Sequence, residues 1–214
     1  MISLYTWLTP NGYKVSIMLE ELGVPYTVHP VDLGAQHQLR PQFLALSPNN
    51  KVPAIVDHDA GPLSIFESGA ILTYLAEKHG RFLAADGPLR YKALEWLHWH
   101  NGGLGPMSQH LVYFLWKWQN QLPAGTQRVA DELNRLLDVI DRRLSEAPYL
   151  AGDDYTIADI INYPWIAAGV TSFAHVLGDL LKSRPHLERW LRAVGQRPAV
   201  RRGMAVPNRQ QAGA

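Results

Sequence analysis

The sequence predicts two parts in succession, an α/β part followed by an all-α part. Strand, helix and strand patterns alternate over residues 2–31, two further strand patterns and a helix extend to about Lys78, and no convincing strand pattern follows. A βαβ unit of this length places its two strands in parallel with a right-handed crossover. The predicted division is therefore a βαβ-ββα domain at residues 1–79 and a helical domain at residues 88–203.

The elements of the first part follow from apolar periodicity and from turn residues. Residues 2–7 and 26–31 are the first two predicted strands, and the helical pattern between them ends at Gly23-Val24-Pro25. A polar loop and a short helix at residues 41–46 come next. Residues 52–57 and 63–66 then form a predicted antiparallel hairpin, and a second helical pattern begins after Glu67.

The second part contains only helical patterns. Residues 91–100 read as a helix that the glycines of residues 102–106 should break or kink, and an aromatic helical stretch through Trp116 and Trp118 follows. Apolar residues between 129 and 144 share one helical face, opposite arginines and aspartates. Thr156-Ile-Ala-Asp159 resembles a capping box with Asp in place of Glu, so we expect Asp159 to cap a helix. Residues 203–214 read as a loose tail.

Composition excludes several classes of function. The 214 residues are 47% hydrophobic and 18% charged, with a net charge of +1, which suits a globular protein and argues against nucleic-acid or membrane binding. No apolar run is long enough to span a membrane, and residues 1–5 lack the basic start of a signal peptide, so we expect a cytoplasmic location. The chain has no cysteine, so any thiol chemistry must be carried by a bound small molecule.

Glu67 and Ser68 stand where a predicted strand passes into a helix. The start of a helix leaves free backbone N–H groups and a partial positive charge, which together can hold a carboxylate. The Ser68 hydroxyl adds a donor, and Glu67 offers an acceptor for an ammonium group. The pair therefore suits the carboxylate and ammonium of an amino acid; the alternative is that Ser68 is only a helix N-cap.

Four motifs together give the chain a resemblance to a known family. They are Thr9-Pro-Asn-Gly-x-Lys-Val, Ser47-Pro-Asn-Asn-Lys-Val-Pro-Ala-Ile, Phe66-Glu-Ser-Gly-Ala-Ile-x-x-Tyr-Leu-Ala-Glu and Tyr155-Thr-Ile-Ala-Asp. In this order and spacing the chain resembles the glutathione transferase superfamily over nearly its whole length. The first motif and Gly102-Gly-Leu-Gly-Pro look like the bacterial Nu-class, whose members are glutathione-dependent disulfide-bond oxidoreductases. The resemblance implies a thioredoxin-like N-terminal domain, an all-helical C-terminal domain and a homodimer.

The resemblance also implies how most of the glutathione molecule is held. Glu67 and Ser68 match the positions that bind its γ-glutamyl end. Val52-Pro53 matches the cis-proline of the family, in which the backbone of the preceding residue pairs with the cysteinyl unit. The alternative for Pro53 is an ordinary trans proline that opens a strand.

Three further residues match positions at the glycyl end or across a dimer. Gln38 matches a position that contacts the glycyl end, and Asn50 lies nearby in the sequence pattern. Arg128 matches an arginine that, in the Nu-class, reaches a glutathione carboxylate across the dimer. The alternative for Gln38 and Arg128 is a solvated surface side chain.

Thr9 and Asn11 are the residues expected to meet the glutathione thiol. A free thiol has a pKa of about 8.5, so little thiolate exists at neutral pH. A hydroxyl, a side-chain amide and free backbone N–H groups at the start of a helix favour the thiolate. One alternative is that these residues only cap the helix, and another is that Tyr5 serves the thiol, as tyrosine does in other classes of the superfamily.

The expected activity is reduction of a small disulfide by a bound glutathione thiolate, without a mixed disulfide on the protein. One alternative is a glutathione transferase or peroxidase that acts on electrophiles or hydroperoxides. Another is a binding protein without turnover, because fold does not fix function. No metal is expected, since His98 and His100 are two residues apart on a helix and point to different faces.

Overall fold

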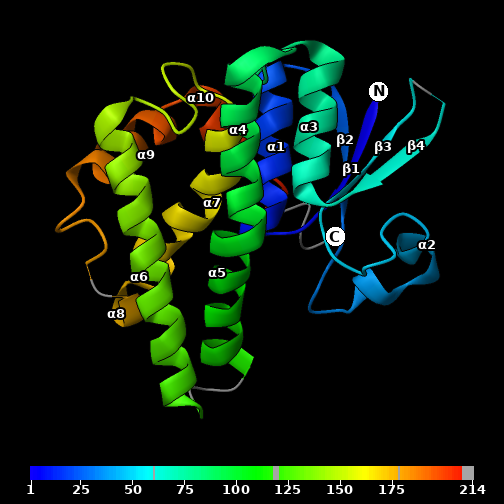
Figure 1. The fold of residues 1–214 in the computed structure, drawn as a ribbon. Coiled ribbons are helices and arrows are strands. Elements are labelled where there is room, and N and C mark those ends of the chain that lie inside the picture. The colour runs from blue at the N-terminus through cyan, green and yellow to red at the C-terminus, as the bar shows by residue number, and fades with distance from the viewer. Residues whose placement is uncertain (60, 118–120, 178, 209–214) are drawn as a thin grey trace. The chain divides into compact units, whose positions relative to one another are not determined.

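The computed structural model of the protein describes residues 1–214 except 60, 118–120, 178 and 209–214, and only the backbone of residues 175 and 176. It divides into two compact units (Figure 1). The first combines residues 1–83 with residues 195–214, and the second contains residues 84–194. The sequence placed residues 88–203 in one domain, whereas the structure groups the last part of that range with the first unit.

A four-stranded mixed sheet forms the centre of the first unit (Figure 1). Its strands are β1 (Ile2–Thr6), β2 (Tyr26–Pro30), β3 (Ala54–Asp57) and β4 (Leu63–Phe66), in the order β2-β1-β3-β4. β1 runs parallel to β2, while the β1–β3 and β3–β4 pairs are antiparallel. This is the βαβ-ββα arrangement that the sequence predicts, and it confirms the thioredoxin-like fold of the N-terminal part.

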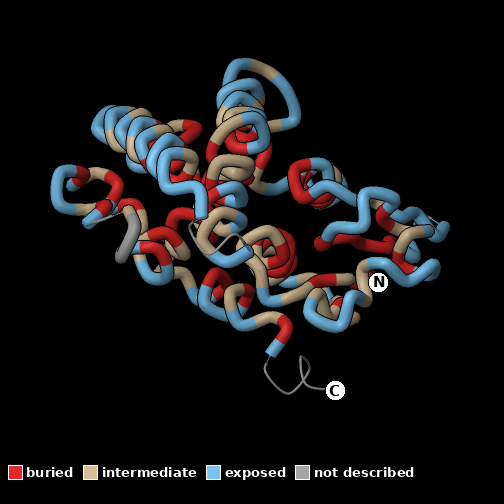
Figure 2. Tube along the Cα trace, turned by 90° about the horizontal axis from the view of Figure 1, so that it is seen from below, coloured by how far each residue is buried: buried red, intermediate tan, exposed pale blue. Residues whose placement is uncertain are grey.

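The helices of the first unit are α1 (Pro10–Leu22), α2 (Pro41–Leu44), α3 (Ser68–His79) and α10 (Pro198–Gly203), with a short 3₁₀ turn, η1 (His37–Leu39). Residues 14–19 of α1 are all buried (Figure 2). Because α1 supplies both the core and the residues expected to meet the thiol, the position of its first turn is fixed by close packing.

The short helix α10 packs directly against α1, which explains why the end of the chain belongs to the first unit. A Cβ atom added to Gly203 would lie 2.5 Å from the Cα of Ile17, so the two backbones touch where only glycine fits. The Ser16 hydroxyl donates a hydrogen bond to the Gly203 carbonyl oxygen at 2.7 Å. Arg197 forms two hydrogen bonds to the Glu21 carboxylate, at 2.6 and 2.9 Å. Pro207 is also buried, so the predicted loose tail begins later than residue 203, and residues 209–214 lie outside the described part.

Every regular element among the described residues of the second unit is helical (Figure 1). In chain order its elements are α4 (Gly87–Trp99), η2 (His100–Leu104), α5 (Gly105–Val112), η3 (Tyr113–Lys117), α6 (Pro123–Glu146), α7 (Ile157–Ser172), α8 (Ala174–Leu177) and α9 (Pro185–Gly195). The sequence predicts a break or a kink at residues 102–106. A break does not occur, because the chain passes from α4 to α5 through a π-helical turn, η2, without leaving the helix. Trp118 lies outside the described residues.

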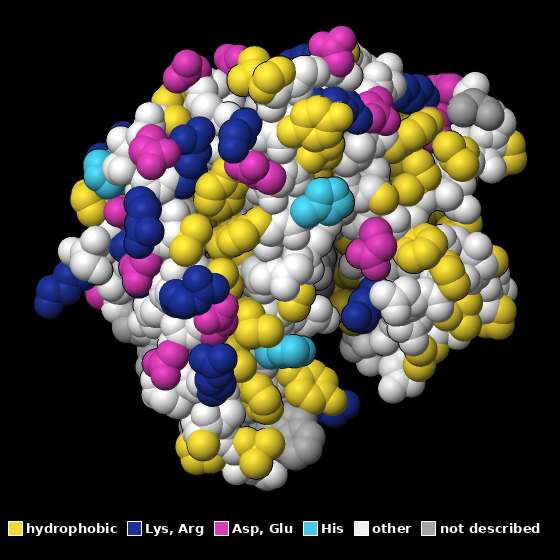
Figure 3. All heavy atoms as spheres, in the orientation of Figure 1, with side chains coloured by type: hydrophobic (Ala, Val, Ile, Leu, Met, Phe, Trp, Pro, Cys, Tyr) yellow, Lys and Arg dark blue, Asp and Glu magenta, His cyan; other side chains and the backbone are white. Residues whose placement is uncertain are grey.

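The long helix α6 is amphipathic, as the sequence predicts. Its buried side chains form one stripe, which includes Leu133, Leu137 and Ile140. Its solvent-facing side carries ion pairs such as Arg135–Glu132 at 2.7 Å, and charges of both signs are interspersed on the surface (Figure 3). No helix of the described residues is both long and apolar enough to cross a membrane.

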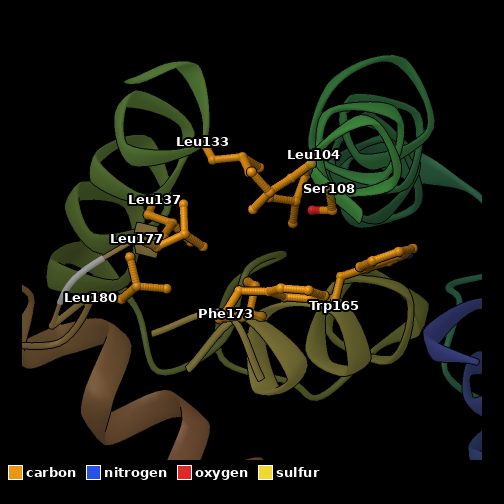
Figure 4. Close-up of a pocket in the computed structure, with 11 residues that line it drawn as sticks. Leu104, Ser108, Leu133, Leu137, Trp165, Phe173, Leu177 and Leu180 are labelled. Atoms are coloured by element: carbon orange, nitrogen blue, oxygen red, sulfur yellow. The ribbon is translucent and has the colours of Figure 1, made fainter. Parts of the chain in front are cut away.

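An apolar pocket lies inside the second unit, between α5, α6, α7 and α8 (Figure 4). Eleven residues line it, mostly leucine and aromatic side chains, and Ser108 supplies the only hydroxyl among them. None of the lining side chains is charged. This pocket therefore lacks the partners that the charged ends of a peptide need.

Candidate functional site

Three segments that carry predicted site residues meet at one end of the sheet. The register pairs Tyr5 of β1 with Ala54 of β3, and Ala54 with Phe66 of β4. The residues that follow β1, precede β3 and follow β4 therefore lie at the same end of the strands. Each of these segments contains a predicted site residue, and two of them lead directly into helices α1 and α3.

Thr9 caps the start of α1 with its side chain. It has extended backbone angles (φ −136°, ψ 150°), and its hydroxyl oxygen accepts a hydrogen bond from the Gly12 N–H at 3.1 Å. The first turn of α1 begins with Pro10 and contains no acidic residue. Accepting this bond leaves the Thr9 hydroxyl proton to be donated, so capping and binding of an anion are compatible.

Gly12 allows the first turn of α1 to lie against the end of β1. A Cβ atom at this position would lie 2.4 Å from Thr6 Oγ1 and 2.5 Å from the Trp7 carbonyl oxygen. Contacts this short do not occur for real Cβ atoms, so a larger residue would push the turn away from the strand. The glycine in the Thr-Pro-Asn-Gly motif therefore fixes where Thr9 and Asn11 stand.

Lys14 is a site neighbour that the sequence reasoning did not single out, although it belongs to the first motif. Its side chain is buried, with 2% of the residue exposed, and its Nζ donates a hydrogen bond to Asn11 Oδ1 at 2.8 Å. Burial lowers the pKa of Lys14 to about 7, and the negative charge of Glu67 partly opposes that shift. A lysine in a run of otherwise small or apolar buried residues is the signal that could have found it.

The start of α3 combines an exposed carboxylate with a buried hydroxyl. Glu67 is the N-cap residue but makes no side-chain capping bond, and Ser68 is the first helical residue, 8% exposed. The alternative role of Ser68 as N-cap is therefore not what the structure has. Asn49, another residue that the sequence reasoning missed, donates a long hydrogen bond to Glu67 Oε1 at 3.4 Å.

Glu67 also has an unusual backbone. Its φ of 70° and ψ of 115° lie in a region that residues with a side chain rarely adopt. Such conformations cost of order 1–3 kcal/mol and cluster at functional sites. The strained residue connects β4 to α3, at the end of the sheet where the other site segments meet.

Val52 and Pro53 lie directly before β3, next to the start of α3. The Val52–Pro53 peptide bond is cis, as the resemblance implies. Val52 is buried in a small apolar cluster with Val31, Phe43 and Ala54. The backbone of Val52 is thereby held at the end of the sheet where Thr9 and Glu67 also lie.

Gln38 and Asn50 lie in the segment that links β2 to β3. Gln38 belongs to η1, and its Oε1 atom is buried without a hydrogen-bond partner in the described part of the chain. A buried acceptor of this kind is costly unless a ligand or a water supplies a donor. Asn50 is exposed and has a φ of 49°, a left-handed conformation that asparagine tolerates.

Two further candidates of the sequence are Tyr5 and Arg128. Tyr5 stacks on His29, with ring centroids 4.6 Å apart, and packs against the apolar cluster around Phe43, which favours a structural role over a thiol partner. Arg128 is exposed near the start of α6, in the second unit. Among the described residues no group of three or more histidine, aspartate or glutamate side chains could hold a metal ion.

A thioredoxin-like unit joined to an all-helical unit is an arrangement found in glutathione transferases, and comparison with known proteins agrees with it. The N-terminal domain of glutathione S-transferases matches residues 1–77, and the C-terminal domain of the same family matches residues 107–198. The chain is 44% identical to the disulfide-bond oxidoreductase YfcG of Escherichia coli K12, over 94% of this chain and 93% of that protein. The chain belongs to the glutathione S-transferase family.

Solved structures are similar over nearly the full length of the chain. A glutathione transferase family member from Pseudomonas fluorescens, solved with two glutathione molecules bound, has a TM-score of 0.90 and 42% identity, and the match covers 95% of this chain and 92% of that one. A glutathione transferase from Pseudomonas putida, with one glutathione disulfide bound per subunit, has a TM-score of 0.90 and 40% identity, with coverage of 96% and 91%.

Proposed function

We propose that this protein is a glutathione-dependent disulfide-bond oxidoreductase of the Nu-class type, which reduces small disulfides with a bound glutathione thiolate. The observation that carries the proposal is the start of α1. It presents the Thr9 hydroxyl and the Asn11 amide, has no acidic residue in its first turn, and belongs to a chain without cysteine. The 44% identity to a disulfide-bond oxidoreductase over nearly the whole chain supports the same reaction class.

The γ-glutamyl end of glutathione is assigned to the start of α3. Its carboxylate would accept hydrogen bonds from the Ser68 hydroxyl and from the free N–H groups of the first turn. Its ammonium would pair with the exposed Glu67 carboxylate. Because these two groups lie side by side on consecutive residues, they match the two charges that an amino acid carries on one carbon atom.

The rest of the tripeptide is assigned to the segments on the other side of that helix start. The cysteinyl unit would pair with the backbone of Val52, which precedes Pro53 and the first ladder residue of β3. The Gln38 amide would serve the glycyl end, where its Oε1, which has no hydrogen-bond partner among the described residues, would accept from the glycyl N–H. Asn50 is placed near the same end.

Thr9 and Asn11 would stabilise the glutathione sulfur as a thiolate. The hydroxyl and the amide NH₂ are neutral donors, and the partial positive charge of the helix start adds to their effect. A hydrogen bond to a charged group contributes about 1.5–3 kcal/mol. Two such bonds are enough to raise the thiolate fraction at neutral pH substantially, because one pKa unit corresponds to about 1.4 kcal/mol.

The reaction then balances without a thiol from the protein. The bound thiolate attacks one sulfur of the substrate disulfide, so that a glutathione–substrate disulfide forms and the second substrate sulfur leaves as a thiolate and takes a proton. A second glutathione thiolate attacks the glutathione sulfur of this mixed disulfide. The products are two substrate thiols and one glutathione disulfide, and the two electrons come from two glutathione molecules.

We also propose that the protein acts as a homodimer in which Arg128 of one protomer reaches a glutathione carboxylate in its partner. The exposure of Arg128 leaves it accessible to another chain. Sedimentation should show a dimer, and Arg128→Ala should weaken glutathione binding without changing that dimer. A monomer in solution would contradict this part of the proposal.

The decisive assay measures turnover of a dialkyl disulfide with glutathione, coupled to the reduction of glutathione disulfide. Disulfide reduction should exceed turnover of an aryl halide and of a hydroperoxide, and it should fall in Thr9→Ala and in Asn11→Ala. Faster turnover of the aryl halide or hydroperoxide would instead identify a transferase or peroxidase. Full activity in both variants would refute the thiolate assignment, and the absence of glutathione binding by calorimetry would refute the function as a whole.

A further inference from the structure

Lys14 is buried in a place where a lysine needs a specific partner. It lies one turn after Asn11 on α1, it is 2% exposed, and residues 15–19 that follow it are buried as well. Lysine is almost never fully buried unless its nitrogen is paired. Burial of this side chain is therefore a cost, and the bond that it makes to Asn11 and the negative charge of Glu67 are two of the interactions that offset it.

The bond from Lys14 determines which way the Asn11 amide faces. A side-chain amide has a carbonyl oxygen on one side and an NH₂ group on the other. Because Lys14 Nζ donates to Asn11 Oδ1 at 2.8 Å, the oxygen is held toward the interior and the NH₂ group is turned away from it. An amine nitrogen donates in its charged and in its neutral form, so this orientation does not depend on the protonation of Lys14.

The opposite orientation of the amide would harm a thiolate site. If Asn11 were flipped, its carbonyl oxygen would face the sulfur anion, and a donor would be replaced by an acceptor that repels it. Lys14 itself is enclosed, whereas Asn11 is only half-buried. The lysine therefore contacts the buried side of Asn11 and does not have to touch the ligand.

We propose that Lys14 is a positioning residue of the thiolate site, which holds the Asn11 amide with its NH₂ group toward the glutathione sulfur. The proposal rests on the proposed function, because that function assigns the sulfur to the start of α1. It adds a residue that acts through Asn11, and it predicts that the two side chains are energetically coupled.

Lys14→Met tests the proposal because methionine fits a buried, unbranched site and removes the donor. Lys14→Gln is the conservative variant, since its amide keeps an N–H donor at the same position. Ser16→Ala is the matched control: Ser16 is also a buried polar residue of α1, but its hydroxyl bonds to Gly203 on α10 and not to the site.

The first measurement is the pKa of bound glutathione, obtained by titrating the ultraviolet absorbance of its thiolate. Lys14→Met should reduce the thiolate fraction at neutral pH and kcat by about tenfold, the effect of losing one well-oriented donor to a charged group. The KM for glutathione should change little, because the γ-glutamyl end is held elsewhere. Lys14→Gln should restore part of the loss, and Ser16→Ala should match the wild type.

The second measurement is a double-mutant cycle with Asn11→Ala. If Lys14 acts through Asn11, Lys14→Met should add no further loss when the Asn11 amide is already absent. Additive losses, or an unchanged thiol pKa in Lys14→Met, would overturn the proposal. Should Lys14→Met fail to fold, Lys14→Leu takes its place in the cycle. A wild-type protein whose bound thiol is not acidified would instead refute the thiolate assignment of the proposed function.

Discussion

The helices α1 and α7 both begin after a threonine that caps the helix with its hydroxyl. Thr9 accepts from Gly12 N at 3.1 Å, and Thr156 accepts from Ala158 N at 3.2 Å. The two helix starts differ in the next residues. The first turn of α7 contains Asp159, which is fully buried, whereas the first turn of α1 has no acidic residue and is half-open to solvent.

Asp159 supplies, from within the chain, the negatively charged acceptor at the start of α7. Its carboxylate accepts from Thr156 N at 3.0 Å, from Leu150 N at 3.1 Å and from Trp190 Nε1 at 2.8 Å. The capping box confirms the sequence-based assignment of Asp159 as a cap. A helix start that contains its own buried anion holds the fold together, while one without an anion, such as α1, can accept an anion from a ligand.

The largest effect expected from this contrast is on stability. Asp159→Ala should lower the free energy of unfolding by at least about 3 kcal/mol, since three buried donors each lose a partner at about 1–3 kcal/mol per group. Urea denaturation measures the change, and Asp154→Ala, an exposed acidic residue five positions earlier, is the control. Equal stability of the two variants would mean that the α7 start is not held by its carboxylate.

The same residue should make stability depend on pH. Burial raises the pKa of Asp159 to about 6, although hydrogen bonds from the backbone of Thr156 and Leu150 act against the shift. With an unfolded pKa of about 3.9, the folded state binds the proton more tightly, so this contribution is full below about pH 4 and is lost as the pH rises through 6. Relative to Asp159→Asn, the wild type should lose roughly 2–3 kcal/mol between these pH values. A flat difference would refute the raised pKa.

At the start of α1 the expected effect is on catalysis. Thr9→Ala and Asn11→Ala should each lower kcat for disulfide reduction roughly tenfold to a hundredfold, the range given by the loss of a bond to a charged group. Thr9→Ala should cost only about 1 kcal/mol of stability, the usual cost of losing a cap. Thr27→Ala, on the exposed side of β2, is the control. If Thr9→Ala loses stability but keeps its kcat, Thr9 only caps its helix, as Thr156 does.

The smallest effect is expected at the start of α3. Glu67→Gln removes the charge assigned to the γ-glutamyl ammonium, so the Kd for glutathione measured by calorimetry should rise about tenfold, the size of one charged hydrogen bond. Turnover at saturating glutathione should hardly change, because Glu67 is not placed at the sulfur. Glu77→Gln, exposed at the other end of α3, is the control. Equal affinities in the two variants would remove Glu67 from the site.

The parts of the fold that depend on local patterns could be predicted from the sequence. Short apolar segments bounded by turn residues located the four strands of the first unit, and Thr156 with Asp159 located the start of α7. Motif spacing also indicated the strand-to-helix turn at Glu67 and Ser68. These features depend on residues that are near one another in the chain.

Features that depend on tertiary contacts could not be predicted in this way. Lysine is usually exposed, and the small and apolar residues around Lys14 do not by themselves show that its amine bonds to Asn11. The glycines of residues 102–106 indicated a break or a kink, but the chain stays helical there, through the π-helical turn η2 and into α5. The return of α10 to α1 depends on the contact of Gly203 with Ile17, two residues that are far apart in the sequence.

The proposed mechanism places the glutathione sulfur at the start of α1. The most direct measurement is a crystal structure of the protein soaked with oxidised glutathione. The proposed mechanism requires one sulfur within hydrogen-bond distance of the Thr9 hydroxyl and the Asn11 NH₂ group, with the γ-glutamyl end at Glu67 and Ser68. A sulfur placed away from residues 9–11, or side chains that fill that space, would contradict it.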